Sequence, residues 1–150
     1  MTTSGGTTTS AVDPEVPPAA RAQTEAGAEA FTTFYMNQVN LGYQETDSSR
    51  LLKISIAACK SCKLSIDAIN QYKVNHQHYI GDFATVSYVT ISSLHLPKAE
   101  VFVATDTQAG KVTNDDNLTV ETLPADKTSL TVYLLWQHGS WAVTEIKVNA

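Results

Sequence analysis

The chain has 150 residues and a net charge of −5, with 43% apolar and 17% charged residues. Its length corresponds to about one domain, with enough apolar residues for a single ordinary core. Binding to nucleic-acid phosphates needs clustered Lys and Arg. Because the ten cationic residues of this chain form no basic run, we expect no nucleic-acid partner.

The first twenty residues differ in composition from the rest of the chain. Residues 2–10 contain only Thr, Ser and Gly, and residues 13–18 include three prolines. Such a segment has too little apolar surface to offset the entropy lost on ordering. We therefore predict a flexible linker over residues 1–20 and a single domain over residues 21–150, with an ordinary frayed terminus as the alternative to a linker.

The sequence around Met1 bears on the cellular compartment. Met1 is followed by neither a cationic region nor an apolar segment, so we expect no intact signal peptide. No stretch approaches the roughly 20 apolar residues that span a bilayer. Two interpretations stay open: a cytosolic protein, or an exported protein whose signal has been removed.

The first element after the linker is a predicted helix from about Ala20 to Asn40. Apolar residues recur there at intervals of three and four, which forms a stripe along one helix face. Gly42 is a plausible stop for this helix. The stripe consists of Ala22, Ala26, Ala30, Phe31, Phe34, Tyr35 and Val39.

Two shorter segments follow the first helix. Residues 47–49 offer N-cap side chains for a segment over residues 51–56. That segment is ambiguous, because its apolar residues also alternate as they do in a strand. Residues 60–75 are predicted to form a helix whose basic last turn suits the negative end of the helix dipole.

From Tyr79 onward the chain is rich in β-branched and aromatic residues, which favour strands. The predicted strands are residues 83–91, 101–105, 118–123, 130–136 and 141–148, the last two joined by a hairpin turn at His138-Gly139. Helices followed by strands in a meander predict an α+β fold, with N-terminal helices packed on a curved antiparallel sheet of four to five strands. We expect this sheet to enclose a cone-shaped cavity that is either a pocket or a packed core.

Cys59 and Cys62 are the only cysteines, and they lie where the third helix begins. A redox-active pair would require a thioredoxin-like alternation of strands and helices, which the strand-rich second half of the chain does not offer. A zinc site needs three or four protein ligands, and His76 and His78 are the nearest additional candidates. We favour a helix-terminal, solvated histidine pair and expect no metal site.

A structural disulfide between Cys59 and Cys62 is the interpretation that we favour. Closing so short a loop contributes only ~2 kcal/mol by the chain-entropy estimate, but it can hold the start of the third helix against the segment before it. Such a bond persists only in an oxidising compartment. The pair therefore predicts a location outside the cytoplasm.

Several segments resemble a family of uncharacterised actinobacterial predicted lipoproteins with a Cys-Lys-x-Cys motif. The resemblance covers residues 21–83 well and the strand half only in outline, and it implies the cone fold of the nuclear-transport-factor-2-like (NTF2-like, cystatin-like) superfamily. It also implies a lipidated cysteine just before Thr2, with residues 2–18 as a surface linker, but no established activity. The segments are residues 25–31, 34–35, 59–62, 66–69 and 80–83.

Cone folds of that superfamily include isomerases and dehydratases, which use a carboxylate base and neutral acid donors in an apolar cavity. Residues of suitable type are present, but their spacing singles out no set, so we name no catalytic residue and no cofactor. These residues are Asp82, Asp106, Glu145, Tyr35, Tyr88 and Tyr133. Large aromatic residues are instead expected to line the core or the cavity, and the candidates for the cavity are Phe31, Tyr35, Tyr88, Tyr133 and Trp136.

Taken together, these observations predict an extracytoplasmic, membrane-tethered α+β cone that acts as a noncatalytic binding or accessory module. Its partner is expected to be an unknown protein or a small apolar ligand. Membrane attachment is expected only through the lipid anchor. The alternatives are an enzyme or carrier that uses the cone cavity, or a cytosolic thiol protein.

Overall fold

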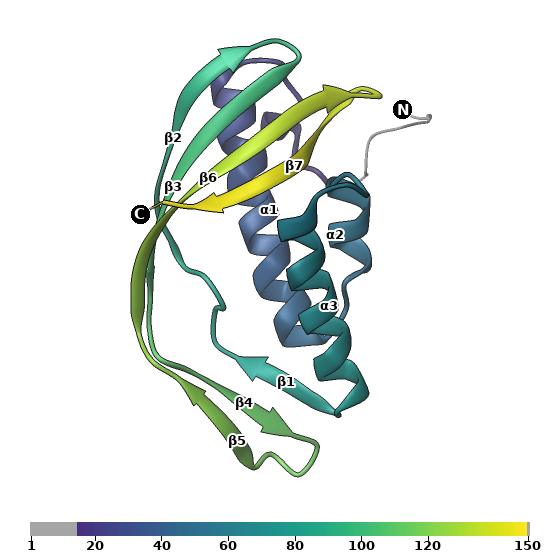
Figure 1. Ribbon diagram of the computed structural model, residues 1–150, viewed down its shortest axis with the longest axis vertical. Coiled ribbons are helices and arrows are strands. Elements are labelled where there is room, and N and C mark those ends of the chain that lie inside the picture. Colours follow the sequence, from purple (N-terminus) through teal and green to yellow (C-terminus); the bar gives the residue numbers. More distant parts are fainter. Residues whose placement is uncertain (1–14, 150) are drawn as a thin grey trace.

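The computed structural model describes residues 15–149. The helices are η2 (Pro18–Ala20), α1 (Glu25–Glu45), α2 (Ser49–Ile54) and α3 (Lys60–Val74). The strands are β1 (Gln77–Ile80), β2 (Val86–His95), β3 (Lys98–Thr107), β4 (Gly110–Asn114), β5 (Thr119–Leu123), β6 (Asp126–Gln137) and β7 (Ser140–Val148). Figure 1 shows the strands as a strongly curved layer with the α-helices on its concave side.

The predicted α+β class, with N-terminal helices packed on a curved antiparallel sheet, is confirmed. The described residues form seven strands rather than four or five. The prediction lacks β1 and β4, because both are short and contain few β-branched residues. The hairpin turn between β6 and β7 lies at His138-Gly139 as predicted, where both residues have the positive φ that a tight two-residue turn requires.

The strands form two sheets that share one long hairpin. One arm of this hairpin is β3 followed by β4, and the other arm is β5 followed by β6. Strands β2-β3-β6-β7 make a four-stranded sheet, and β1-β4-β5 make a three-stranded sheet. Only residues 108–109 separate β3 from β4, and only residues 124–125 separate β5 from β6. The hairpin therefore runs from one sheet into the other and bends at these connectors (Figure 1). Pro124 lacks an N–H group, so the ladder is interrupted at the bend.

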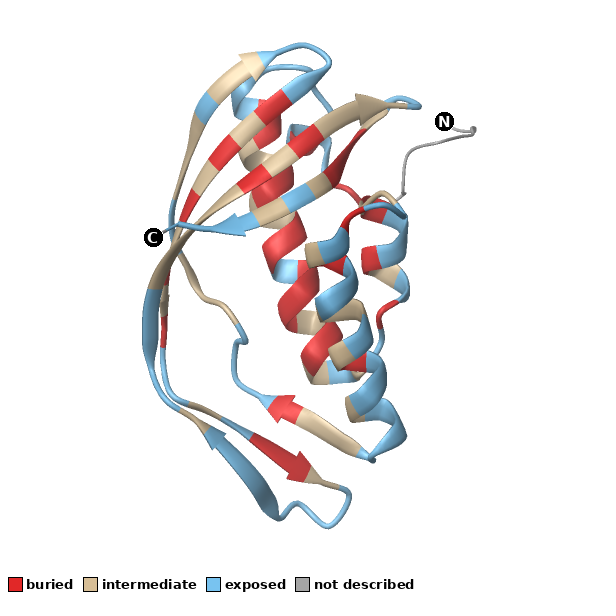
Figure 2. Ribbon diagram, viewed as in Figure 1, coloured by how far each residue is buried: buried red, intermediate tan, exposed pale blue. Residues whose placement is uncertain are grey.

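The core lies between α1 and the concave face of the four-stranded sheet. Side chains alternate along β3, with Ala99, Val101 and Val103 buried and their neighbours less so, as the period of two in a strand requires. Phe31 and Tyr35 of α1 are fully buried. Figure 2 shows the buried residues concentrated along α1 and alternating on the strands that face it.

Helix α1 is displaced toward the C-terminus relative to its predicted range. It begins at Glu25 because the Thr24 hydroxyl accepts a hydrogen bond from Gly27 N (2.9 Å), the geometry of an N-cap. The predicted stop, Gly42, is wrong, since the helix continues to Glu45. A Cβ atom at Gly42 would come within 2.8 Å of the Ile69 Cδ1 atom of α3. The glycine therefore permits close packing of α1 and α3.

The predicted boundary between linker and domain at residue 20 is also wrong. Val16 and Ala20 are buried in the core, and η2 consists of residues that the prediction placed in the linker. The Trp141 side chain of β7 donates a hydrogen bond to Ala22 O (2.9 Å), which ties this segment to the sheet. A prediction from average composition does not detect that one valine between two prolines, Val16, is buried in the core. Residues 1–14 of the predicted linker lie outside the described residues.

The segment at residues 51–56, predicted as either a helix or a strand, is helical in its first part and extended at its end. Its first part is α2, and just before this helix the Asp47 carboxylate accepts a hydrogen bond from Ser49 N (2.9 Å). This hydrogen bond lowers the pKa of Asp47. The end of the segment then lies along β7, where Ile56 N donates to Val143 O (2.9 Å). Within residues 15–149, none of the helices has the length and apolar character needed to cross a bilayer.

Candidate functional site

The five aromatic residues predicted to line a cavity are not brought together in the structure. Phe31 and Tyr35 lie in the core beneath the sheet, where burial raises the pKa of Tyr35. Tyr88 is 59% exposed. Its ring lies 6.5 Å from that of Phe102, whose strand neighbours Val101 and Val103 face the core, so this pair belongs to the outer face.

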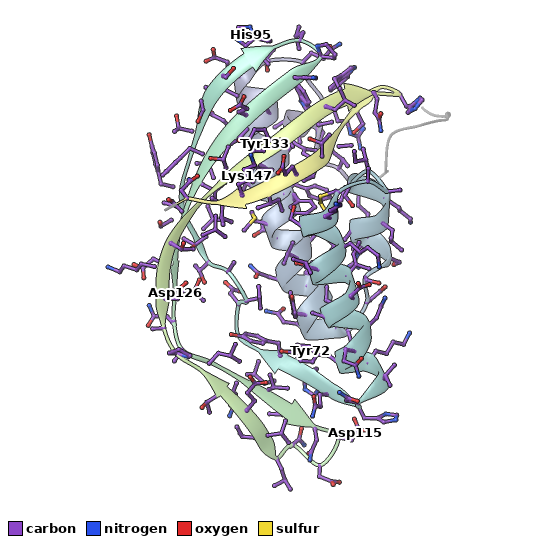
Figure 3. All side chains as sticks on the ribbon, in the orientation of Figure 1. Tyr72, His95, Asp115, Asp126, Tyr133 and Lys147 are labelled. Atoms are coloured by element: carbon purple, nitrogen blue, oxygen red, sulfur yellow. A yellow bond between two sulfur atoms is a disulfide. The ribbon has the colours of Figure 1, made fainter. Side chains whose placement is uncertain are left out.

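The remaining two aromatic residues lie on β6. Tyr133 is also on the outer face, with the Lys147 ammonium 5.5 Å from its ring centre (Figure 3). Trp136 packs edge-to-face on Trp141, with ring centres 5.3 Å apart. The aromatic residues of the prediction are thus divided among the core, the outer face and the β6–β7 hairpin. Residue type alone does not specify the face of a strand.

Cys59 and Cys62 form a disulfide at the start of α3. Both are buried, and the Cys59 sulfur also accepts a hydrogen bond from Cys62 N, as an N-cap does. Ser61, between them, accepts a hydrogen bond from Ile146 N of β7 (2.7 Å). The disulfide loop therefore holds the start of α3 against the sheet.

The two histidines considered as metal ligands have different partners. His76 lies 3.5 Å from Asp115, whereas the His78 ring is 3.1 Å from the Thr113 hydroxyl. In the described part of the chain, no group of three or more His, Cys, Asp or Glu side chains is arranged to hold a metal ion.

A cavity of about 360 Å³ lies where the long hairpin bends, and we call it the bend cavity. Its volume is within the range of small-molecule sites, roughly 300 to 1,000 Å³. None of the five predicted aromatic residues lines it. The lining residues are Tyr79, Phe83, Ala84, Thr105, Thr107, Leu123, Pro124, Asp126, Thr128 and Leu130.

The hairpin wall of the bend cavity continues the inner face of the core. Within the core, β3 and β6 place Val101 opposite Val132. Toward the bend, the same face carries Thr105 opposite Thr128, and then Thr107 opposite Asp126. The inner face therefore changes from aliphatic to hydroxyl and carboxyl side chains. This change converts a packed core into a cavity with hydrogen-bonding groups.

The opposite wall is formed by β1 and the segment that leads from it into β2. Phe83 stacks on Tyr43 of α1 at 3.9 Å, and the Tyr79 ring lies 5.8 Å from that of Phe83. Ala84 is held by the Asn40 side chain, which donates to Ala84 O (3.0 Å) and accepts from Ala84 N (2.9 Å). These contacts to α1 hold the wall in position without a ligand.

Tyr79 is fixed by packing, and its surroundings raise the pKa of its phenol. Its hydroxyl and ring lie so close to Gly110 that a Cβ atom at this position would overlap them. Burial first, and the Glu121 carboxylate second, raise the pKa of Tyr79. The phenol therefore stays protonated at neutral pH and is available as a hydrogen-bond donor.

The carboxylates considered as catalytic candidates lie outside the bend cavity. Asp106 is paired with Lys127 (3.8 Å), and Glu145 is near Lys147 (3.9 Å). Asp82 accepts a hydrogen bond from the Thr85 hydroxyl (3.3 Å) at an exposed position. The carboxylate that does line the cavity is Asp126, which the sequence prediction missed. A usable signal was the alternation along residues 101–107, where valine is replaced by threonine on one face.

Comparisons with known proteins agree with this fold. A model of a family of unknown function, DUF6318, matches residues 6–147, so the chain belongs to the DUF6318 family. No curated protein matches the chain. The intermembrane space region of the chloroplast protein ARC6 is similar in structure, with a TM-score of 0.61 and 12% identity over 85% of this chain and 97% of that one.

Two further solved structures are similar to this chain. An uncharacterised protein with a cystatin-like fold from Caulobacter vibrioides has a TM-score of 0.50 and 10% identity, over 83% of this chain and 92% of that one. A structure whose name begins Rd1NTF2_05 has a TM-score of 0.43 and 8% identity, over 79% of this chain and 96% of that one. The Caulobacter vibrioides structure confirms the predicted α+β, cystatin-like class at the level of fold.

Proposed function

We propose that this member of the DUF6318 family is a noncatalytic binding module whose site is the bend cavity. The observation that carries the proposal is the change along the inner face of the long hairpin, from aliphatic pairs in the core to threonine and aspartate at the bend. A preformed, mostly apolar cavity with a few polar groups is the usual form of a small-molecule site. The ligand is a compact, mainly apolar molecule that makes one or two hydrogen bonds.

The polar groups of the cavity support binding over catalysis. General acid–base catalysis needs a group that exchanges a proton near the operating pH. The hydroxyls of Thr105, Thr107 and Thr128 do not titrate in that range, and the raised pKa of Tyr79 keeps its proton in place. These groups orient a ligand through hydrogen bonds.

The alternative is a cavity enzyme of the NTF2-like type with Asp126 as its base. A carboxylate of this kind typically lies in a buried, apolar environment. Asp126 is exposed at the rim of the bend cavity. We therefore favour the binding module.

The test is a titration of the isotopically labelled protein with phenol and cyclohexanol, followed by amide NMR shifts. We expect shifts in residues 79–84, 105–107 and 123–130. The variant Ala84→Phe fills the cavity and is expected to weaken binding at least about tenfold. Its control, Ala104→Phe, places the same side chain on the outer face and should leave binding unchanged. Shifts confined to the outer face, or equal binding by the two variants, contradict the proposal.

We also propose that the module acts outside the cytoplasm and is attached to the membrane by a lipid group on its N-terminal side. The paired, buried cysteines support an oxidising compartment. The Cys-Lys-x-Cys resemblance to predicted actinobacterial lipoproteins supports the anchor. Neither argument depends on the identity of the ligand.

The location is tested with protein isolated from its native host. Alkylation of free thiols during lysis, followed by mass spectrometry, should find Cys59 and Cys62 unmodified by the alkylating reagent. Partition into the detergent phase and labelling by a fatty-acid analogue are expected if the chain is lipidated. Two alkylated cysteines in a soluble fraction would contradict both parts of this proposal.

A further inference from the structure

We infer that the bend cavity selects organic cations, that is, molecules with an ammonium group on a compact apolar body. The inference rests on the proposed function and adds the charge of the ligand. It is carried by one unpaired carboxylate in the cavity lining, Asp126, together with the aromatic rings of Tyr79 and Phe83 in the same lining. Carboxylate and aromatic faces together are the usual groups that bind ammonium ions.

Asp126 is available for a ligand. Within residues 15–149 its carboxylate has neither an ion-pair nor a hydrogen-bond partner, and in the sheet it lies opposite Thr107 on the inner face. The neighbouring pair in the ladder shows the contrast. Asp106 lies opposite Lys127, and these two side chains form an ion pair (3.8 Å). Two adjacent positions of one hairpin thus carry one neutralised carboxylate and one that is not neutralised.

The chain around the cavity adds a negative field. The segment that leads into the bend, residues 119–126, contains the acidic residues Glu121 and Asp126 and no Lys, Arg or His. Glu121 pairs with Val112, which in turn pairs with Tyr79, so the three side chains form a row across the small sheet. Leu123, two residues from Glu121, lines the cavity. The negative charges of Glu121 and Asp126 favour a cation at this site.

The aromatic wall suits the same ligand. A cation is attracted to the face of a Tyr or Phe ring within about 6 Å of its centre. Stacking on Tyr43 fixes Phe83, and packing on Gly110 fixes Tyr79. The threonine hydroxyls of the hairpin wall can accept the N–H groups of an ammonium ion. None of the lining residues is a Lys, Arg or His, so the lining provides no cationic partner for a carboxylate or phosphate ligand.

The experiment compares two probes of the same shape, benzylammonium and benzyl alcohol, by NMR titration at pH 7 and low salt. We expect both to shift the cavity amides and benzylammonium to bind about tenfold more tightly, since the charge adds an ion pair and a cation–π contact. The preference should shrink in 0.5 M NaCl because salt screens exposed charges.

Asp126→Asn removes the charge and keeps the shape. It is expected to abolish most of the preference for benzylammonium while leaving benzyl alcohol unaffected. Asp106→Asn is the matched control on the opposite face of the same ladder and should preserve the preference. Equal binding of the two probes, or a preference that survives Asp126→Asn, overturns this inference and leaves the proposed function in place. If neither probe shifts the cavity amides, both proposals fall.

Discussion

The two halves of the long hairpin have the same antiparallel pairing but differ in the side chains on their inner face. In the half that faces α1, the inner positions of β3 and β6 are aliphatic and closely packed, as Val101 opposite Val132 illustrates. In the half at the bend, the equivalent positions hold threonines and Asp126 around a cavity. We call these the core half and the bend half. Their difference indicates that the core half maintains the fold, whereas the bend half presents polar groups to a cavity.

The largest contrast is expected from removal of an aromatic side chain that packs against each half. Phe31→Ala, in α1 against the core half, should lower the free energy of unfolding by about 3 to 5 kcal/mol, because a fully buried ring leaves a cavity. Phe83→Ala, in the cavity wall opposite the bend half, should lower it by only about 1 to 2 kcal/mol, since Phe83 is 36% exposed. Chemical denaturation of both variants measures the difference. Equal losses would mean that the wall of the bend cavity is part of the core.

The disulfide loop tests what holds the helices on the core half. The double substitution Cys59→Ala and Cys62→Ala is expected to lower stability by about 2 kcal/mol through the unfolded chain. Ser61→Ala should lower the free energy of unfolding by a further 1 to 3 kcal/mol, roughly, because Ile146 N then loses its hydrogen-bond acceptor. The measurements are urea midpoints with and without reductant. A wild-type midpoint that does not respond to reductant would indicate that the loop contributes nothing to stability.

A pair of substitutions on β6 tests the contrast most directly. Val132→Thr places an unpaired hydroxyl in the core and should cost about 1 to 3 kcal/mol. Thr128→Val, four residues away on the same face, should change stability by less than about 0.5 kcal/mol, because Thr128 is half-buried and faces a cavity. Thermal or urea unfolding of the two variants is sufficient. A large cost for Thr128→Val would show that the threonine is needed for packing.

Alkaline pH is expected to produce the smallest effect. Burial raises the pKa of Tyr35 above its ordinary value of 10.0. The stability linked to Tyr35 is therefore complete below pH 10 and is lost as the pH rises above it, by at most about 1.4 kcal/mol at pH 11. Because the buried hydroxyl has no hydrogen-bond partner in residues 15–149, Tyr35→Phe should be nearly neutral at pH 8.

The measurement compares unfolding free energies at pH 8 and pH 11 for the wild type and Tyr35→Phe. The variant should lose less stability over this interval than the wild type. Identical losses would assign the alkaline sensitivity to the other tyrosines with raised pKa values, Tyr43, Tyr72 and Tyr79.

Much of the fold was predictable because it depends on local patterns. The apolar stripe of α1, the helix after the cysteines and the β-branched segments of β2, β3, β6 and β7 are repeated signals over many residues. The errors were at positions that long-range packing decides. The sequence predicts a helix stop at Gly42, whereas this glycine packs against Ile69. It also predicts a linker at Val16, whereas this side chain is buried in the core.

The candidate site was less predictable than the fold. Aromatic size predicts Tyr88 and Tyr133 as cavity residues, and both lie on the outer face, where Tyr133 lines a pocket separate from the bend cavity. The residues that line the bend cavity are mostly small or polar, and they come from separate parts of the chain between Tyr79 and Leu130. Their convergence depends on where the hairpin bends and on how α1 holds the segment around Ala84.

From the sequence alone followed the α+β class, the helix-first order of elements and the nearness of Cys59 to Cys62, because periodicity and spacing act over short distances along the chain. Only the tertiary structure decided which face each strand presents, where the core ends and where a cavity opens. These features depend on register and on the bend at Pro124, which bring together residues far apart in the sequence. The same arrangement places Asp126 in the lining of the bend cavity.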